Sequence, residues 1–429
     1  MEKVGKEDAI HNFKIAFDIR RYPLHVYCIF LGILTASFDI FMTIDIGGFT
    51  FRISQVFFII AIIWMIAVIV KQRKIFIPIE GFFLLTWIIL QGFFISNSPN
   101  IKNAISYFLW LLIDVLIVMV IYYSFNTKKS FEKLFKFYID SFMIMSILGI
   151  MQLLLSIIGV RFYVVQMWTS RWARINGFTY EPSYYSTYLL PGWIIVMYLL
   201  ENETSLYTNK QLRVRAILIT LALFLSTSRM GWLMMVFWIL LRVGIYMKNF
   251  FTGKIKSKHI KMIGLLFLAT ILGVMLFQWL NAKMDISFLL DGLAILNSDG
   301  HSSTARIDVM IRAFSVFKEH PWYGVSLGGV DPAVAEMYNM AFENGMSACV
   351  WVEILVASGI FGTIIFGGWI VCFIKKVIVI SKMGKYEAKA LIYAFLFECM
   401  ILSFNQNILR IYFWILIGVI SSLCRAYKR

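Results

Sequence analysis

The chain has 429 residues, of which 60% are hydrophobic and only 15% are charged, and its formal net charge is +16. A composition this apolar excludes one large soluble domain and indicates a helical protein that crosses a membrane many times. The basic balance does not indicate a nucleic-acid partner, because excess Lys and Arg in a membrane protein more often marks cytoplasmic loops. All five cysteines lie inside apolar runs, so we expect neither a disulfide framework nor a bound metal.

Twelve apolar runs are long enough to cross a hydrocarbon layer of about 30 Å. The seventh and eighth are nearly continuous, and we divide them at Ser228 and Arg229, because one helix would be too long and would hold an arginine at its centre. The sequence therefore predicts an all-α, polytopic membrane protein with about twelve transmembrane helices. The expected spans are residues 24–44, 53–70, 77–95, 103–123, 137–159, 183–200, 214–228, 230–247, 262–280, 347–374, 388–405 and 408–424.

Lysine and arginine divide differently between the two sides that these spans define. Segments on the side of the N terminus carry 21 Lys and 8 Arg, whereas the opposite segments carry 3 Lys and 8 Arg. The lysines place both termini in the cytoplasm by the positive-inside rule. The positive-inside rule does not explain the arginines on the outer side, and their planar guanidinium groups suit a phosphate or carboxylate ligand. The alternative is that they extend to the membrane surface or pair with Asp45, Asp285 or Glu319.

The chain is expected to form one transmembrane domain over residues 1–429. Its cytoplasmic connections are short and basic, which is typical of segments that touch the membrane surface. Two extracytoplasmic segments are longer, at residues 160–182 and 281–346. We therefore expect the chemistry on the outer side, with the loop at 281–346 as its main cover.

The first of these segments ends in RWARINGFTYEPSYYS, residues 171–186. It places Arg171 and Arg174 before a Gly turn, and Glu181 at the start of a helix whose first turn suits Pro182. The positive end of a helix dipole stabilises a carboxylate, so Glu181 is either an ordinary helix-start acid or a catalytic base. Its aromatic neighbours can form a sugar-stacking wall or an interfacial belt.

The motif STSRMGW, residues 226–232, places Arg229 at the tip of a tight helical hairpin. One interpretation is an arginine that only extends to the membrane surface. The interpretation we favour is a contact with a phosphate, because lipid-linked phosphates lie at this depth.

The large loop is predicted to contain an amphipathic helix on the outer surface. Its apolar residues recur at helical spacing, at Ile307, Met310 or Ile311, Phe314 and Phe317. Arg306 opposes the helix dipole near its start, which favours a contact with a ligand, although a contact with Asp308 or Glu319 is the alternative. His320 and Pro321 end the helix, and a Gly-rich turn follows.

Polar residues also lie beside and inside the later apolar runs. Glu343 and Asn344 precede the span expected at residues 347–374. Carboxylates inside a membrane span are functional candidates by default, although most of them should be packing or inter-helix partners. These carboxylates are Asp39, Asp114, Asp140, Glu353 and Glu398.

The order of STSRMGW, then STARIDVMIRAFSVFKEHPWYGVSLGG at 303–329, then ENGMSACVWVEILVASGIFG at 343–362 resembles the O-antigen ligase and polysaccharide polymerase superfamily of bacterial envelopes. The resemblance covers residues 174–362. Ligases have a His-Asn pair where this chain has Glu343 and Asn344, and GFTYEPS at 177–183 is similar to the polymerase branch. The resemblance therefore favours a polymerase, with a ligase as the alternative and a flippase or other transporter as a third hypothesis.

This resemblance implies a GT-C-like architecture in the bacterial inner membrane and an inverting glycosyl transfer without metal or other cofactor. The implied donor is an oligosaccharide on undecaprenyl pyrophosphate, and the acceptor of a polymerase is a second lipid-linked repeat unit. Implied partners are these substrates, membrane lipids, a chain-length regulator and a flippase. Wherever sugar leaves a pyrophosphate, fixed arginines can stabilise the leaving group, and a carboxylate can accept the proton of the acceptor hydroxyl.

Candidate residues follow from both lines of reasoning. Arg229 and Arg306 are expected to face the pyrophosphate, with Arg174 and Arg312 as supports. The base is Glu181 or Glu343, with His301 as a further possibility. The candidate catalytic residues are thus Glu181, Glu343, Arg306 and Arg229, and the candidate substrate-binding residues are Arg171, Arg174, Arg312, Asn344, His301 and Tyr180.

Overall fold

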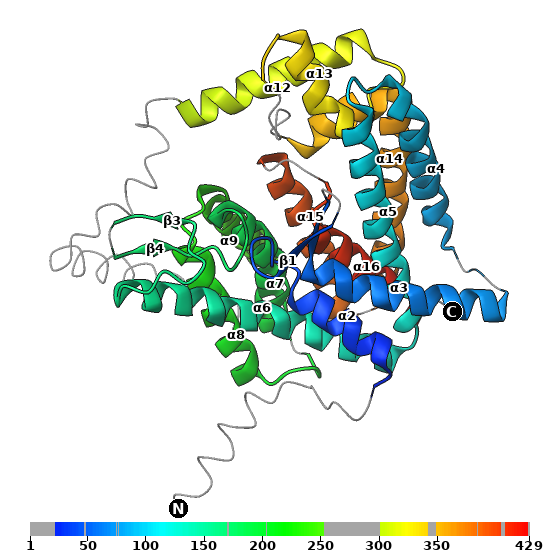
Figure 1. Cartoon of the computed structure of the whole chain (residues 1–429). Helices are drawn as coiled ribbons and strands as arrows, with labels where there is room; N and C mark the ends of the chain where they lie inside the picture. Colours follow the sequence, from blue (N-terminus) through cyan, green and yellow to red (C-terminus); the bar gives the residue numbers. More distant parts are fainter. Residues whose placement is uncertain are drawn as a thin grey trace, which may run out of the picture.

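The structure, a computed structural model, is almost entirely helical (Figure 1). The residues it describes are 22–46, 49–73, 75, 77–169, 171–202, 204–252, 301–341, 349–383, 385–404 and 408–427. The helices are α2 (Leu24–Leu34), α3 (Ile53–Gln72), α4 (Ile79–Phe93), η1 (Phe94–Asn97), α5 (Ile101–Ser124), α6 (Lys128–Ile157), α7 (Pro182–Glu201), α8 (Asn209–Leu225), α9 (Arg229–Phe251), α12 (His301–Glu319), η2 (Leu327–Gly329), α13 (Val330–Met337), α14 (Val350–Lys382), α15 (Tyr386–Ile401), η3 (Leu402–Phe404) and α16 (Ile411–Ala426).

The prediction of an all-α polytopic membrane protein is confirmed. Within the described residues, six helical stretches are long and apolar enough to cross a membrane, namely α3, α4 with η1, α5, α6, α9 and α14. Two more, α2 and α16, are shorter apolar helices. The division of the seventh and eighth runs is also confirmed, because α8 ends at Leu225 and α9 begins at Arg229. The expected span at 262–280 lies outside the described residues.

The first expected span is wrong in its second half. Within this span, only Leu24–Leu34 is helical. Strands β1 (Thr43–Ile46) and β2 (Phe49–Arg52) then pair in an antiparallel arrangement. Thr35 is at the end of the helix, where its hydroxyl donates to the Leu31 carbonyl at 2.7 Å, and the chain then turns. Short polar side chains that bond to the backbone compete with helix formation, and this run contains several of them.

Helices distant in sequence pack together in pairs that position the later site. α16 packs against α5, α15 against α7, and α4 against α14, while α8 packs against both α6 and α7. α12 and α13 lie at one end of the molecule, beside the beginning of α14 (Figure 1). A second small hairpin, of β3 (Gln166–Met167) and β4 (Ala173–Arg174), lies in the connection between α6 and α7.

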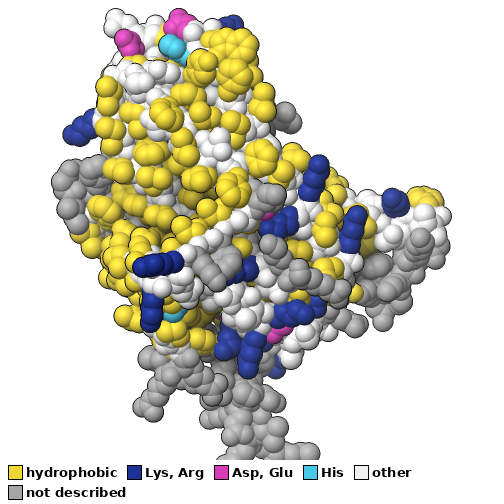
Figure 2. Space-filling model, turned by 90° about the vertical axis from the view of Figure 1, so that its right-hand side faces the viewer, with side chains coloured by type: hydrophobic (Ala, Val, Ile, Leu, Met, Phe, Trp, Pro, Cys, Tyr) yellow, Lys and Arg dark blue, Asp and Glu magenta, His cyan; other side chains and the backbone are white. Residues whose placement is uncertain are grey.

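One side of the molecule presents a broad hydrophobic surface, with Lys and Arg gathered toward its lower part (Figure 2). α4 and α14 contribute large exposed apolar side chains that would be unfavourable in water and suit contact with lipid tails. They include Phe82, Phe83, Ile89, Phe93, Phe361, Ile364 and Val371.

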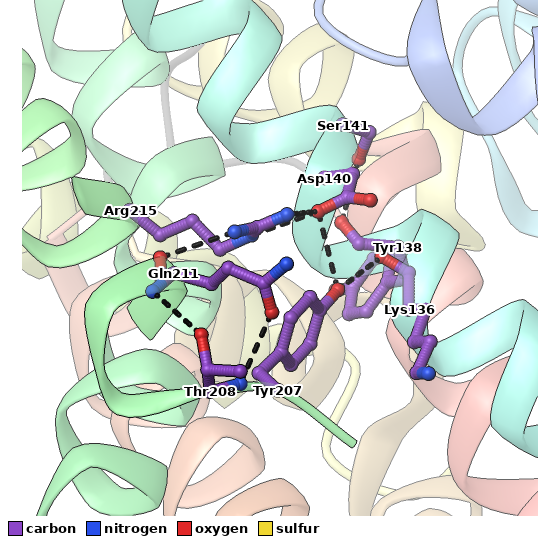
Figure 3. Close-up of polar contacts among 8 residues, drawn as sticks. All are labelled: Lys136, Tyr138, Asp140, Ser141, Tyr207, Thr208, Gln211 and Arg215. Atoms are coloured by element: carbon purple, nitrogen blue, oxygen red, sulfur yellow. Dashed lines mark hydrogen bonds and ion pairs between the residues drawn. The ribbon is translucent and has the colours of Figure 1, made fainter. Parts of the chain in front are cut away.

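Of the five carboxylates in the expected spans, Asp140 shows most clearly how a buried acid joins two helices. Figure 3 shows Asp140 of α6 facing Arg215 of α8, with an N–O distance of 2.6 Å, and both side chains are buried. The Tyr207 hydroxyl lies 3.1 Å from an Asp140 carboxylate oxygen and 2.9 Å from the Lys136 carbonyl oxygen, and it can donate its hydrogen to either acceptor. This cluster joins α6 to α8.

Candidate active site

The segment between α6 and α7 presents Glu181 at the N terminus of α7. Glu181 is the N-cap residue and Pro182 occupies the first turn, which confirms the predicted helix start. The carboxylate is exposed, and it accepts a hydrogen bond from the Ser183 hydroxyl at 2.8 Å. Tyr180 beside it is 43% exposed. A carboxylate in this position is both accessible to a ligand and held by the helix start.

The turn before Glu181 is held in one conformation by α6. The side-chain oxygen of Gln152 accepts the backbone N–H groups of Asn176 and Gly177, at 3.3 and 2.9 Å. Gly177 has φ +50°, and a Cβ there would lie 2.2 Å from the ring of Tyr185, so only glycine fits. Sequence reasoning missed Gln152, because nothing in an apolar helix 24 residues earlier indicates which turn it supports.

Arg174 connects this segment to the tip of the α8–α9 hairpin. Its Nε donates to the Thr227 hydroxyl at 2.8 Å, its terminal nitrogens donate to Gln166 and the Thr227 carbonyl, and its guanidinium lies over the Trp168 ring. Burial lowers the pKa of the guanidinium, the like charge of Arg229 lowers it further, and Glu181 opposes the shift. Arginine remains protonated in proteins, so the shift reports that the charges of Arg229 and Glu181 both act on Arg174.

Arg229 is the first residue of α9 and is exposed. The Ser228 hydroxyl caps this helix by accepting the Gly231 N–H. Gly231 lies so close to α7 that a Cβ on it would be 1.9 Å from the Ser186 hydroxyl. Among the residues the structure describes, the Arg229 guanidinium has no ion-pair or hydrogen-bond partner. The starts of α7 and α9 therefore lie together, with a carboxylate on one and a free cation on the other.

α12 is present as predicted and ends at Glu319, just before His320 and Pro321. Its buried face is formed by Ala313 and Val316. Three of the apolar residues noted at helical spacing are more than 40% exposed, namely Ile307, Ile311 and Phe314. The helix carries two apolar stripes, and the one with small side chains packs against the protein because it allows a closer approach.

Arg312 has its own partners in the α12–α13 region. Its guanidinium lies over the Tyr338 ring at 5.7 Å and donates to the Met340 sulfur at 3.1 Å. It is therefore bonded to the end of α13, and no described contact joins it to Glu181 or Arg229.

The Gly-rich turn after α12 is bonded to a break in α14. The N–H groups of Val325 and Ser326 donate to the carbonyls of Val356 and Ala357 at 3.2 and 2.9 Å, and the Ile360 N–H donates to the Pro321 carbonyl at 2.8 Å. Gly359 makes the break possible with φ 61° and ψ −168°, a conformation that is essentially restricted to glycine. The turn that ends α12 is thus fixed to the protein through backbone bonds.

The remaining candidates are placed as follows. Arg171 is exposed in the same segment as Arg174, and its carbonyl accepts the Ser156 hydroxyl. His301 and Arg306 belong to α12, but their side chains lie outside the described part of the structure. Glu343 and Asn344 also lie outside the described residues.

Arg410, which is absent from the sequence candidates, lies beside the Glu181 segment. It is 6% exposed, and its guanidinium lies 3.7 Å from the centre of the Tyr184 ring in the first turn of α7. The signal that could have found it is an arginine inside an expected membrane span, which is costly unless it has a specific role.

Comparisons with known proteins agree with the earlier resemblance. Residues 215–367 match the protein family described as O-antigen ligase. The match extends from α8 through α9, α12 and α13 into α14, and so includes Arg229, Arg306 and the turn bonded to α14. No curated protein matches the chain.

Proposed function

We propose that this chain, whose residues 215–367 match the family described as O-antigen ligase, is a polysaccharide polymerase of the bacterial inner membrane. It transfers a glycan from an undecaprenyl-pyrophosphate donor to a lipid-linked repeat unit of O-antigen or capsule, on the outer face of that membrane. The observation that carries this proposal is that the starts of α7 and α9 lie together, with Glu181 on one and Arg229 on the other, while Arg174 is bonded to Thr227 just before α9.

Two helix N termini meeting at this place favour a bound anion, because the helix dipole gives each a partial positive charge. Arg229 adds a full charge that is free among the described residues, so it can contact the donor pyrophosphate. Arg174 is already bonded to Thr227 and Gln166, so its role is to hold the tip of the α8–α9 hairpin and to add positive electrostatic potential at the site.

The reaction then needs one proton acceptor and one stabilised leaving group. Glu181 takes the proton of the acceptor hydroxyl as its oxygen attacks the anomeric carbon. The bond from that carbon to the pyrophosphate oxygen breaks, and Arg229 stabilises the charge that develops there. Attack from the face opposite the leaving group inverts the anomeric configuration, and Glu343 and Arg306 are further candidates for the same two roles.

Purified full-length protein with a synthetic lipid-linked repeat unit should make a ladder of longer products without nucleotide or metal. Arg229→Ala and Glu181→Gln should each lower kcat at least 100-fold, because one transition-state contact or a general base contributes about 10² or more. Arg213→Ala changes an exposed arginine near the other end of α8 and should leave kcat unchanged. Normal elongation by Arg229→Ala would contradict the proposal.

A ligase is the alternative, because the matching family is described as O-antigen ligase. A ligase would use the same Glu181 and Arg229 but would pass a finished chain to an acceptor other than the carrier lipid. In the same assay, transfer of a preformed chain to a separate lipid acceptor, with no ladder on the carrier, would favour the ligase.

A further inference from the structure

The surface of α12 is divided into a buried face, a charged face and an exposed apolar face. Ala313 and Val316 form the buried face. Asp308 and Glu319 are exposed and lie about three turns apart on the charged face. The third face, here called the α12 stripe, consists of Ile307, Ile311 and Phe314, which are 52%, 59% and 42% exposed. A helix of a water-soluble protein buries its apolar face, so the α12 stripe requires an apolar neighbour outside the chain.

Two exposed aromatic residues follow α12. Trp322 and Tyr323 are 54% and 57% exposed. Their rings lie 5.6 and 5.7 Å from the ring of Phe361, which is 47% exposed and follows the break in α14. Because the backbone bonds between this turn and α14 fix the turn in place, both rings are held at the surface of the protein.

Phe361 connects these two rings to the lipid-facing surface. That surface consists of exposed apolar side chains of α4 and α14, among them Phe93 at 71% and Ile364 at 66% (Figure 2). Residues 81–97 of the α4 region and residues 361–374 of α14 contain no charged side chain. The end of α12 therefore adjoins a surface that suits contact with lipid tails.

Trp322 and Tyr323 lie where charged side chains end and this uncharged surface begins. Glu319 and His320 come just before them and are exposed. Tryptophan and tyrosine are enriched at the interface between membrane and water, because each joins an apolar ring to a polar N–H or O–H group. The position of this pair is thus typical of residues in the headgroup layer.

We propose that α12 and the turn after it form an anchor in the interfacial layer of the membrane. The α12 stripe points toward the acyl chains, Trp322 and Tyr323 lie among the headgroups, and Asp308 faces water. The partner is lipid and not a second copy of the chain, because the anchor adjoins the lipid-facing surface. A helix of this kind lies in the plane of the interface with its apolar face buried by roughly 5–10 Å.

The anchor goes beyond the proposed function, since it depends on no step of the reaction. It fixes the depth of α12 in the membrane relative to α14, because the turn that carries the two rings is bonded to α14.

Spin labels on full-length protein in phospholipid nanodiscs test this arrangement. In a variant without the five native cysteines, a label on Ile311→Cys should be relaxed more by oxygen, which concentrates in the membrane, than by the water-soluble complex Ni-EDDA. The two values should place this label roughly 5–10 Å deep. Asp308→Cys is the matched control, because it is exposed on the charged face of the same helix, and Ni-EDDA should relax its label more than oxygen does.

The aromatic pair is tested with the same label at position 311. Trp322→Ser combined with Tyr323→Ser should move this label closer to water, so its relaxation by Ni-EDDA should rise. Tyr386→Ser changes an exposed tyrosine at the start of α15 and should leave the depth unchanged. An unchanged depth in the double variant would overturn the role given to Trp322 and Tyr323.

Two results at position 311 would overturn the anchor itself. Relaxation by Ni-EDDA as strong as that of the label at position 308 would show that the α12 stripe lies in water. An immobile label that neither reagent reaches would show that a protein partner covers the stripe. All the substituted side chains in this design are exposed, so each variant should elute like wild type in size-exclusion chromatography.

Discussion

Among single residues, the buried ion pairs show which charges serve the fold and which serve the site. Asp140 and Arg215 satisfy each other inside the α6–α8 contact. Arg215→Met should lower the free energy of unfolding by about 3–5 kcal/mol, because it leaves a buried carboxylate without its counterion. Asp140→Leu with Arg215→Met should recover most of that loss. Tryptophan fluorescence during thermal unfolding measures both, and equal destabilisation by the single and double variants would contradict the pairing argument.

The sequence was informative where a residue's role depends on its near neighbours. Glu181 precedes a proline and follows a glycine turn, and Arg229 follows a serine that can cap a helix, so both were predictable. The position of Arg410 inside an expected span could have marked it, but its contacts with Tyr184 and Asp39 could not be predicted, because these residues lie hundreds of positions earlier in the chain. Contacts between distant elements leave no periodic signal along the sequence.

For helices and turns too, the sequence predicted what depends on the local pattern and missed what depends on contacts between distant elements. Long apolar runs predicted α3, α5 and α6 well, since length and hydropathy alone define a membrane helix. The sequence predicted α12 as an amphipathic helix but did not identify the stripe that packs inward, because two apolar stripes compete and only the neighbouring helices decide between them. Both β-hairpins escaped prediction. The strands β3 and β4 have two residues each and are too short to produce an alternating pattern. The strands β1 and β2 do alternate polar and apolar residues around a Gly-Gly pair, which is a hairpin signal that the sequence interpretation overlooked.

The break in α14 yields a prediction for the turn that ends α12. Gly359→Ala would place a Cβ 2.4 Å from the Trp322 backbone and force a side chain into a glycine-only conformation, at a cost of about 1–3 kcal/mol for the backbone alone. The bonds to residues 321–326 should weaken, so trypsin should cleave at Lys318 faster than in wild type and elongation should fall.

Gly367→Ala is the matched control in the same helix, because a Cβ there meets nothing within 4 Å. It should leave both cleavage and elongation unchanged, or slightly stabilise the helix. Cleavage of Gly359→Ala at the wild-type rate would show that the turn does not depend on this break.

For the molecule as a whole, the arrangement of charge predicts which side of the membrane each end faces. Lys-rich connections belong in the cytoplasm and the α12–α13 region outside, by the positive-inside rule. The proposed reaction requires this orientation, since its repeat units are displayed on the outer face.

Cysteine labelling of intact cells tests this orientation. In a variant without the five native cysteines, Lys318→Cys on α12 should react with a membrane-impermeant maleimide in intact cells. Lys129→Cys at the start of α6 should react only after the membrane is opened, although both positions are exposed. The reverse pattern would put Glu181 and Arg229 on a side without displayed repeat units. Polymerisation at this site would then be excluded even if every local contact were correct, because the substrates could not reach it.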